Sequence, residues 1–252
     1  MYKYIFKCIL SSCFLFFSLN SFSQKTSQKR LKANTEIINN QKNKDENKTD
    51  SISYKTGYGL RLGIDISKPA LAIFDKSYSG LELVGDYRIS KNWYIATEIG
   101  YEEEITFEDF TKSTSKGNFI RLGANYNAYK NWLDMNNEIY VGFRYGFASF
   151  DQTLNNYKTN VGTNYFASNT IKTPVTETGL TAHWTEIQLG IKVETFKNLF
   201  LSAGFSYKIM MSVDDQKNFK TLYAPGFNRV FESNTGFGFN YTISYLIPFV
   251  NK

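Results

Sequence analysis

The sequence is poor in the residues that disulfide, metal and nucleophilic chemistry require. Its 252 residues include two cysteines, one histidine and four prolines. Both cysteines, Cys8 and Cys13, lie in the N-terminal apolar segment, so the chain after this segment has neither a disulfide nor a reactive thiol. The single histidine, His183, is too little for a zinc-type site, which needs several His or Cys ligands. We therefore predict no catalytic residue, no cofactor and no metal.

Long apolar runs are also absent. A helix that crosses a membrane needs roughly 20 consecutive apolar residues, and no such run follows residue 24. The formal charge is +6, and removal of two leader lysines, Lys3 and Lys7, lowers it by two to +4. This charge is too small to indicate nucleic acid as a partner, and no basic stripe stands out. Aromatic residues, in contrast, are abundant, with 18 Tyr and 22 Phe, which favours a protein of many strands.

The first 23 residues have the layout of a secretory signal peptide. Two lysines precede an apolar run over residues 8–19, and Ser21 and Ser23 occupy positions −3 and −1 of a cut before Gln24. The apolar run is short for a membrane anchor. We therefore predict a cleaved signal peptide over residues 1–23.

A lipoprotein is the alternative form of processing. The segment Leu10-Ser11-Ser12-Cys13 resembles a lipobox, which would make Cys13 the acylated first residue. The apolar run continues past this cysteine, from Phe14 to Phe17, whereas a lipobox usually closes the run. Both routes stay open, and cleavage before Gln24 is favoured.

Residues 24–56 form a polar segment. They are rich in Lys, Asn, Gln, Asp and Glu, and they contain no aromatic residue before Tyr54. Such a segment has too little apolar surface to offset the entropy lost on ordering. We predict a disordered periplasmic arm that serves as a spacer, or alternatively as a docking peptide for an envelope protein partner.

Residues 57–252 show the alternation of β-strands, and we assign them to one barrel. Hydrophobic residues recur at every second position in eight segments. One face of each segment carries no Asp, Glu, Lys or Arg. The segments cover residues 58–66, 81–89, 93–102, 120–128, 138–147, 185–194, 199–211 and 236–249.

The opposite face is rich in glycine and in charges of both signs. The interior of an eight-stranded barrel is just wide enough for side chains, so balanced charges would plug it. An apolar interior with charges outside, as in a lipocalin, gives the same alternation, so parity alone leaves both arrangements open. We predict an interior polar network of Arg61, Asp65, Glu82, Asp86, Arg88, Glu98, Glu102, Arg121, Glu138, Arg144, Glu186, Lys192 and Lys208.

Loop lengths and charge placement favour the membrane arrangement. A lipid-facing charge costs about 2–4 kcal/mol at mid-depth, so a face without charges fits lipid. Transmembrane barrels alternate short periplasmic turns with long outer loops. Long connections are expected at residues 68–79, 105–117, 151–180 and 213–235, and short ones at Ser90-Lys91-Asn92, near Lys130-Asn131 and at Phe196-Lys197-Asn198. The prediction is an all-β fold, an eight-stranded antiparallel up-and-down transmembrane β-barrel, with both termini in the periplasm.

Aromatic residues are expected to form two belts at the membrane interfaces. The last segment alternates aromatic and aliphatic residues from Tyr241 to Phe249, which resembles the signal that the outer-membrane insertion machinery reads during assembly. We place Trp93, Trp132, Phe196 and Phe249 in the belt near the short turns, and Tyr101, Phe119, Phe147, Trp184 and Tyr207 in the belt near the long loops.

With these features in hand, the chain resembles the small outer-membrane β-barrel proteins of Bacteroidota, and among them a family of unknown function. The resemblance covers residues 57–249 and includes turn segments such as Lys91-Asn92-Trp93-Tyr94-Ile95. It implies the outer membrane of a Gram-negative cell, with membrane lipid as a partner. It defines no site residues.

Two features of the sequence are candidate catalytic or metal sites. His183 is expected on the lipid face near the outer rim, where no Gly-x-Ser-x-Gly elbow accompanies it, so a catalytic role is not favoured. The acidic residues Glu102-Glu103-Glu104 and Glu108-Asp109 are expected in a solvated loop, with a Ca²⁺ site as the alternative.

The predicted function is therefore that of a non-enzymatic barrel with a structural or surface-interaction role, in which the loops 151–180 and 213–235 are the contact surface. A small channel, a lipid-modifying barrel enzyme and a soluble lipocalin-like periplasmic binder are the alternatives.

Overall fold

The computed structural model describes residues 57–129, 136–158, 170–217 and 219–251. The predicted signal peptide over 1–23 and the arm over 24–56 lie outside the described residues. So do Trp132 and the turn near Lys130-Asn131.

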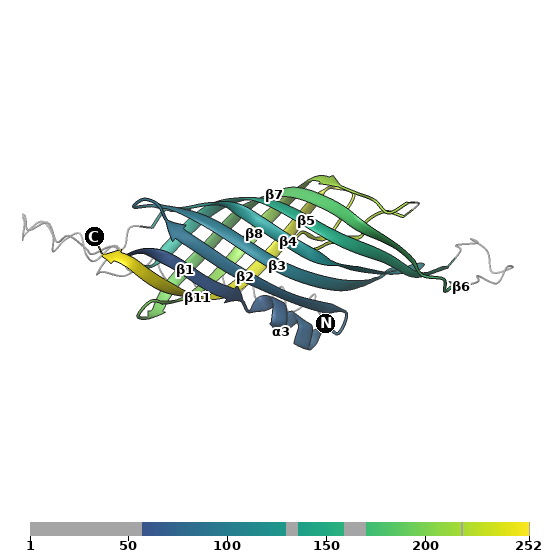
Figure 1. Cartoon of the computed structure of the whole chain (residues 1–252), viewed down its shortest axis with the longest axis horizontal. Helices are drawn as coiled ribbons and strands as arrows, with labels where there is room; N and C mark the ends of the chain where they lie inside the picture. Colours follow the sequence, from purple (N-terminus) through teal and green to yellow (C-terminus); the bar gives the residue numbers. More distant parts are fainter. Residues whose placement is uncertain (1–56, 130–135, 159–169, 218, 252) are drawn as a thin grey trace, which may run out of the picture. The chain divides into compact units, whose positions relative to one another are not determined.

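Eight long antiparallel strands close into a barrel (Figure 1). Each strand pairs with its neighbour in the sequence, β4 pairs with β5, and β1 pairs with β11 to close the ring. This arrangement confirms the predicted eight-stranded up-and-down barrel. The strands are β1 (Gly57–Asp65), β2 (Tyr78–Arg88), β3 (Trp93–Phe107), β4 (Thr111–Asn127), β5 (Glu138–Lys158), β7 (Val175–Phe196), β8 (Leu199–Val213) and β11 (Thr235–Asn251).

Four short elements lie in the connections. They are the helix α3 (Ser67–Phe74) and the strands β6 (Thr170–Ile171), β9 (Tyr223–Ala224) and β10 (Asn228–Arg229). The helix falls where a loop was expected, and its Pro69 is in the first turn, where the missing N–H of proline costs nothing. No helix in the described ranges is long and apolar enough to cross a membrane.

The two faces of the strands separate as predicted. In β7, for example, Leu189 is 52% exposed on the outside, whereas the neighbouring Gln188 is 2% exposed inside. The same alternation places most of the large apolar residues of the eight strands on the outer surface and most of the charged residues inside. The lipocalin-like arrangement is therefore wrong, because it requires the apolar face to be buried.

Two of the expected long loops are, over much of their described residues, strands instead. The segment 105–117 continues β3 and β4 to a turn over 108–110, and the segment 151–180 contains the ends of β5 and β7. These ends carry polar residues on both faces, so they lack the alternation by which strands are recognised, although their backbones pair regularly. The turn between β7 and β8 is short as predicted, and Asn198 takes a positive φ of 65° there.

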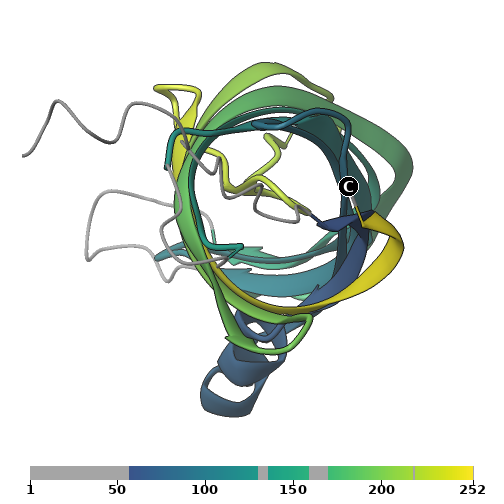
Figure 2. The ribbon, with the colours of Figure 1, turned by 90° about the vertical axis from the view of Figure 1, so that its left-hand side faces the viewer.

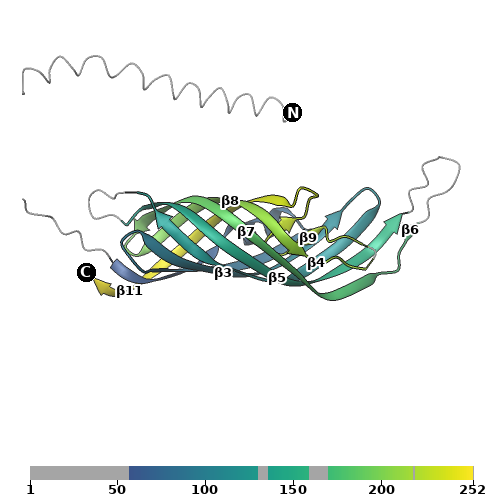
Figure 3. The same cartoon turned by 90° about the horizontal axis from the view of Figure 1, so that it is seen from above.

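The barrel wall is consequently higher on one side. Residues 175–181 of β7 pair with β5 but not with β8, whose pairing ends at Val213. The outer ends of the neighbouring strands continue together past the rest of the barrel, on the side of β6 in Figures 1 and 3. We call this part the extended wall; it comprises residues 103–107 of β3, 111–116 of β4, 150–158 of β5 and 175–181 of β7.

Candidate functional site

Ion pairs fill the barrel interior, beginning near the short turns. Arg61 of β1 contacts Asp86 and Glu138, with N–O distances of 2.5 Å each, and its guanidinium lies 4.6 Å from the ring centre of Tyr94. Lys192 of β7 pairs with the same Asp86. All of these charged groups are buried, and each finds an opposite charge, as buried ions require.

Arg121 of β4 is the centre of the middle layer. Its guanidinium pairs with Glu82, lies 2.8 Å from Glu98 and lies 3.4 Å from Glu186. The other two cations of this layer are Arg144, 3.2 Å from Glu98, and Lys208, 3.9 Å from Glu186. Strands β2, β3, β4, β5, β7 and β8 are thus connected across the interior by one network.

Glu102 of β3 organises the end near the long loops. One carboxylate oxygen accepts from Lys68 Nζ at 2.5 Å and from the Tyr78 hydroxyl at 3.0 Å. The other accepts from the Tyr223 hydroxyl at 2.7 Å and from the Gly226 amide at 2.8 Å. Helix α3 and the connection from β8 to β11 are therefore both tied to one buried carboxylate.

The connection from β8 to β11 folds into the barrel. Figure 2, a view along the barrel axis, shows part of it inside the ring of strands. Ala224 and Phe227 have no exposed surface, and the Phe227 ring packs edge-on against Trp184 with centroids 6.0 Å apart. Lys208 donates to the Gly226 carbonyl at 2.6 Å. The prediction that the whole of 213–235 is an outer contact loop is therefore wrong for 223–227, because these largely apolar side chains are covered by the barrel.

Twelve of the thirteen residues predicted for the interior network are buried. The exception is Arg88, which lies beside the short turn, donates to the carbonyls of Ser90 and Lys91, and is only half-buried. Asp65 is inside but accepts from the backbone amides of Ser67 and Tyr241, so it ties the start of α3 to β11; within the described residues it makes no ion pair. The prediction missed Lys68, since the alternation ends where α3 begins.

The outer aromatic belt is wrong at two positions. Phe119 and Trp184 are 3% and 0% exposed, and both belong to the apolar cluster that is completed by the buried residues 223–227, which we call the inward loop. Their sequence parity matches that of the inward-facing Arg121 and Glu186, and this parity is the signal in the sequence for their burial. Trp93, Tyr101, Phe196 and Phe249 are exposed as expected, and Phe147 and Tyr207 are partly exposed.

The two candidate sites of the sequence, His183 and the acidic cluster, do not form catalytic or metal-binding arrangements in the described residues. His183 lies on the outer face as predicted, where its Nδ1 is 2.7 Å from the Tyr145 hydroxyl. The acidic residues are separated, because Glu102 is inside the barrel and Glu108 pairs with Arg229. Within the described residues, no group of three His, Cys, Asp or Glu side chains could hold a metal ion.

The wall is incomplete between β2 and β11. Strand β1 ends at Asp65, so it pairs only with residues 83–87 of β2 and with residues of β11 from Thr242 onward. In the part of the chain that the structure describes, residues 78–82 of β2 and 235–241 of β11 therefore have no strand partner on the sides that β1 would cover. Helix α3 packs beside this seam (Figure 1).

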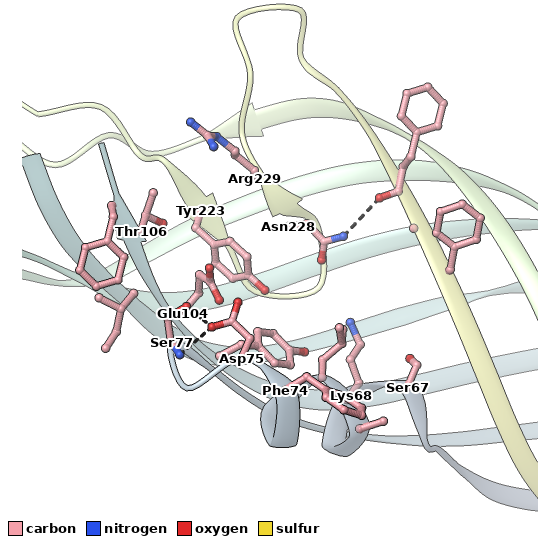
Figure 4. A pocket seen from close by; sticks show the side chains of 18 of the residues that line it. Ser67, Lys68, Phe74, Asp75, Ser77, Glu104, Thr106, Tyr223, Asn228 and Arg229 are labelled. Atoms are coloured by element: carbon pink, nitrogen blue, oxygen red, sulfur yellow. Dashed lines mark hydrogen bonds between the residues drawn. The ribbon is translucent and has the colours of Figure 1, made fainter. Parts of the chain in front are cut away.

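A groove of about 740 Å³ lies at the seam (Figure 4). Its lining combines outward residues of α3 and β11 with Glu104, Thr106 and Tyr223 of the barrel mouth. Asp75, just after α3, accepts from the hydroxyl and the amide of Ser77 at 2.5 and 2.9 Å, and these bonds hold the pKa of Asp75 below its usual range. We call this feature the lateral groove.

Together these features define a closed antiparallel barrel with an apolar outer surface and a charged, filled interior. The chain belongs to the family described as Domain of unknown function (DUF6048), whose model matches residues 1–252. The predicted membership of a family of unknown function is confirmed, while the Bacteroidota origin stays a prediction.

Similar folds occur among solved structures. Neisserial surface protein A is 12% identical, with a TM-score of 0.40 and coverage of 77% of this chain and 99% of that one. Ail, the attachment invasion locus protein of Yersinia pestis, is 10% identical, with a TM-score of 0.38 and coverage of 75% of this chain and 97% of that one. No curated protein matches the sequence significantly.

Proposed function

We propose that this protein is a non-enzymatic barrel of the outer membrane, closed along its axis, which presents the extended wall at the cell surface as a contact surface. The observation that carries the proposal is the combination of an outer face that is uncharged along the regularly alternating segment of all eight strands with an interior occupied by ion pairs and by residues 223–227.

Burial supports the membrane location. Side chains such as Leu122, Phe143 and Ile191, which lie within β4, β5 and β7, are 51–55% exposed. In water so large an apolar surface would favour association with other surfaces, whereas in a bilayer it contacts lipid. The short turns and both strand termini of the barrel lie at the same end, which we assign to the periplasm.

The filled interior supports a closed axis. The cavity that we find between Arg61, Asp86 and Arg144 measures about 30 Å³, which is room for a water molecule or two but not for a solute. At the other end of the barrel, the inward loop covers the network with Phe227 and Tyr223. An open channel would require both to move.

The extended wall supports the contact role. It rises past the rest of the barrel and, with its adjoining turns, exposes Phe107, Phe110, Ile171 and Val175, which are between 36% and 62% exposed. Apolar side chains at the rim of a polar surface mark sites of contact with other proteins or surfaces.

Labelling of intact cells tests location and orientation. After Cys8 and Cys13 are replaced by Ser, a single cysteine at Thr176 in the extended wall should react with a membrane-impermeant maleimide. A single cysteine at Lys197 in the β7–β8 turn should react only after the outer membrane is permeabilised. The opposite result, or recovery of the protein in the soluble periplasm without detergent, would contradict the proposal.

Two further measurements test the closed axis and the contact role. The refolded protein should give no steady conductance in a planar lipid bilayer, and a steady open current would refute closure. Deletion of the gene should reduce adhesion of the cells, and the wild-type gene should restore it. A variant with Val175→Asp and Phe110→Asp should insert normally but not restore adhesion; full restoration would refute the contact role.

A further inference from the structure

We propose that the lateral groove binds an aminolipid, that is, an amphiphile with an apolar chain and a headgroup amine. The chain would lie between helix α3 and strand β11, and the amine would lie between Asp75 and Glu104. The groove shares residues 104–107 of β3 with the extended wall. Its preference for an amine is measured on the purified protein and adhesion is measured on cells, so either proposal can fail without the other.

The apolar side of the groove continues the outer surface of the barrel. Phe237 and Phe239 of β11 are 58% and 67% exposed, and Leu71 and Phe74 of α3 are 51% and 88% exposed. All four line the groove. A short helix that turns such residues outward needs an apolar partner. The inference rests here on the proposed membrane location, in which the neighbouring barrel surface contacts lipid, so that the chain of a lipid is the partner at hand.

The seam connects this apolar surface to polar groups. Because β1 ends at Asp65, side chains of the barrel mouth, such as Glu104, Thr106 and Tyr223, line the same groove as the outward-facing Phe237 and Phe239. A volume of about 740 Å³ lies within the range of small-molecule sites. An amphiphile can therefore place its chain outside and its headgroup inside without crossing a paired sheet.

Charge selects the headgroup. The two cations that line the groove are already neutralised, Lys68 by Glu102 and Arg229 by Glu108. The carboxylates of Asp75 and Glu104 lie next to each other in Figure 4, and in the described part of the chain neither is paired with a cationic side chain. An amine placed between them would form charge-assisted hydrogen bonds and relieve their mutual repulsion. An anionic headgroup would meet repulsion instead.

The test uses amphiphiles of one chain length and three heads. Dodecylamine, dodecanol and dodecanoate are added at pH 7.5 to the full-length protein in detergent, and the bound molecules are counted by native mass spectrometry. We expect dodecylamine to bind at least about tenfold more tightly than the other two. Butylamine, which has the head without the chain, should bind at least about tenfold more weakly than dodecylamine.

Matched variants locate the site. Asp75→Asn with Glu104→Gln should abolish the preference for the amine. Glu103→Gln with Asp109→Asn also removes two negative charges, at positions just outside the groove, and should keep the preference for the amine. Both double variants leave the residues of the buried network unchanged. A difference in gel mobility between heated and unheated samples that equals that of the wild type confirms that each barrel is folded. Equal binding of the three heads, tighter binding of dodecanoate, or equal loss in the two double variants would overturn the proposal.

Discussion

Removal of the central cation of the interior gives the sharpest prediction about stability. Arg121 contacts three buried carboxylates, and two of these, Glu98 and Glu186, each have a second cation nearby. Glu82 has no second ion pair among the described residues, so Arg121→Met leaves it buried without a partner. The loss of one partner from a buried pair costs about 3–5 kcal/mol. The ratio of folded to unfolded protein should therefore fall by roughly 150-fold to 4,000-fold.

The assay is reversible unfolding in urea in the presence of lipid vesicles, followed by tryptophan fluorescence. Lys116→Met, an exposed change on the same strand, is the control and should alter the free energy of unfolding by less than about 0.5 kcal/mol. Addition of Glu82→Gln to Arg121→Met removes the unpaired charge and should recover at least about 1 kcal/mol. A stability of Arg121→Met equal to that of the control, or a double variant no more stable than Arg121→Met, would refute the network as a stabilising unit.

Three other predictions concern the outer surface, the inward loop and a loop carboxylate. Leu122→Arg should lower the stability of the inserted barrel by about 2–4 kcal/mol while Leu122→Phe leaves it unchanged, as measured by insertion into vesicles; equal insertion would contradict a lipid-facing position. At Gly226 φ is +77° and a Cβ would lie 2.5 Å from a phenyl ring, whereas at Gly179 φ is +75° and a Cβ would have no neighbour within 4 Å. Gly226→Ala should therefore speed amide hydrogen exchange across 219–229 far more than Gly179→Ala. Similar exchange rates in the two variants would argue against the packed loop. Hydrogen bonds from the hydroxyl and amide of Thr181 hold the pKa of Asp214 below its usual range. The stability that they contribute is therefore present at neutral pH and is lost as the pH falls through that pKa. Thr181→Ala should raise the pKa of Asp214 in a carboxyl NMR titration, and an unchanged pKa would exclude the hydrogen bond from the hydroxyl.

The alternation of residues was enough to predict the barrel. Neighbours such as Leu189 and Gln188 take opposite faces because side chains alternate along a strand, and the penalty for charge in lipid keeps one face uncharged. The same rule gives inward parity to the twelve residues of the predicted interior network that are buried in the structure. The same parity also predicts that Phe119 and Trp184 face inward, whereas the expectation of an aromatic belt placed them on the outside.

Features that depend on tertiary contacts were outside the reach of this rule. The early end of β1, the helix that follows it and the inward position of Lys68 arise where no periodicity exists. The burial of Tyr223 and Phe227 depends on Glu102 and Trp184, which are distant in the sequence. Arg88 has inward parity and was predicted inside, but it lies at the end of its strand and donates to the carbonyls of the adjoining turn.

The central claim is that the apolar face of the strands contacts lipid and the charged face is enclosed. It is tested most directly by spin labels on single cysteines at positions 187–191 of β7, in protein that lacks Cys8 and Cys13 and is inserted into lipid bilayers. Collision rates with oxygen, which concentrates in the bilayer, should be high at 187, 189 and 191 and low at 188 and 190. High rates at 188 and 190, or no alternation along the strand, would contradict the account.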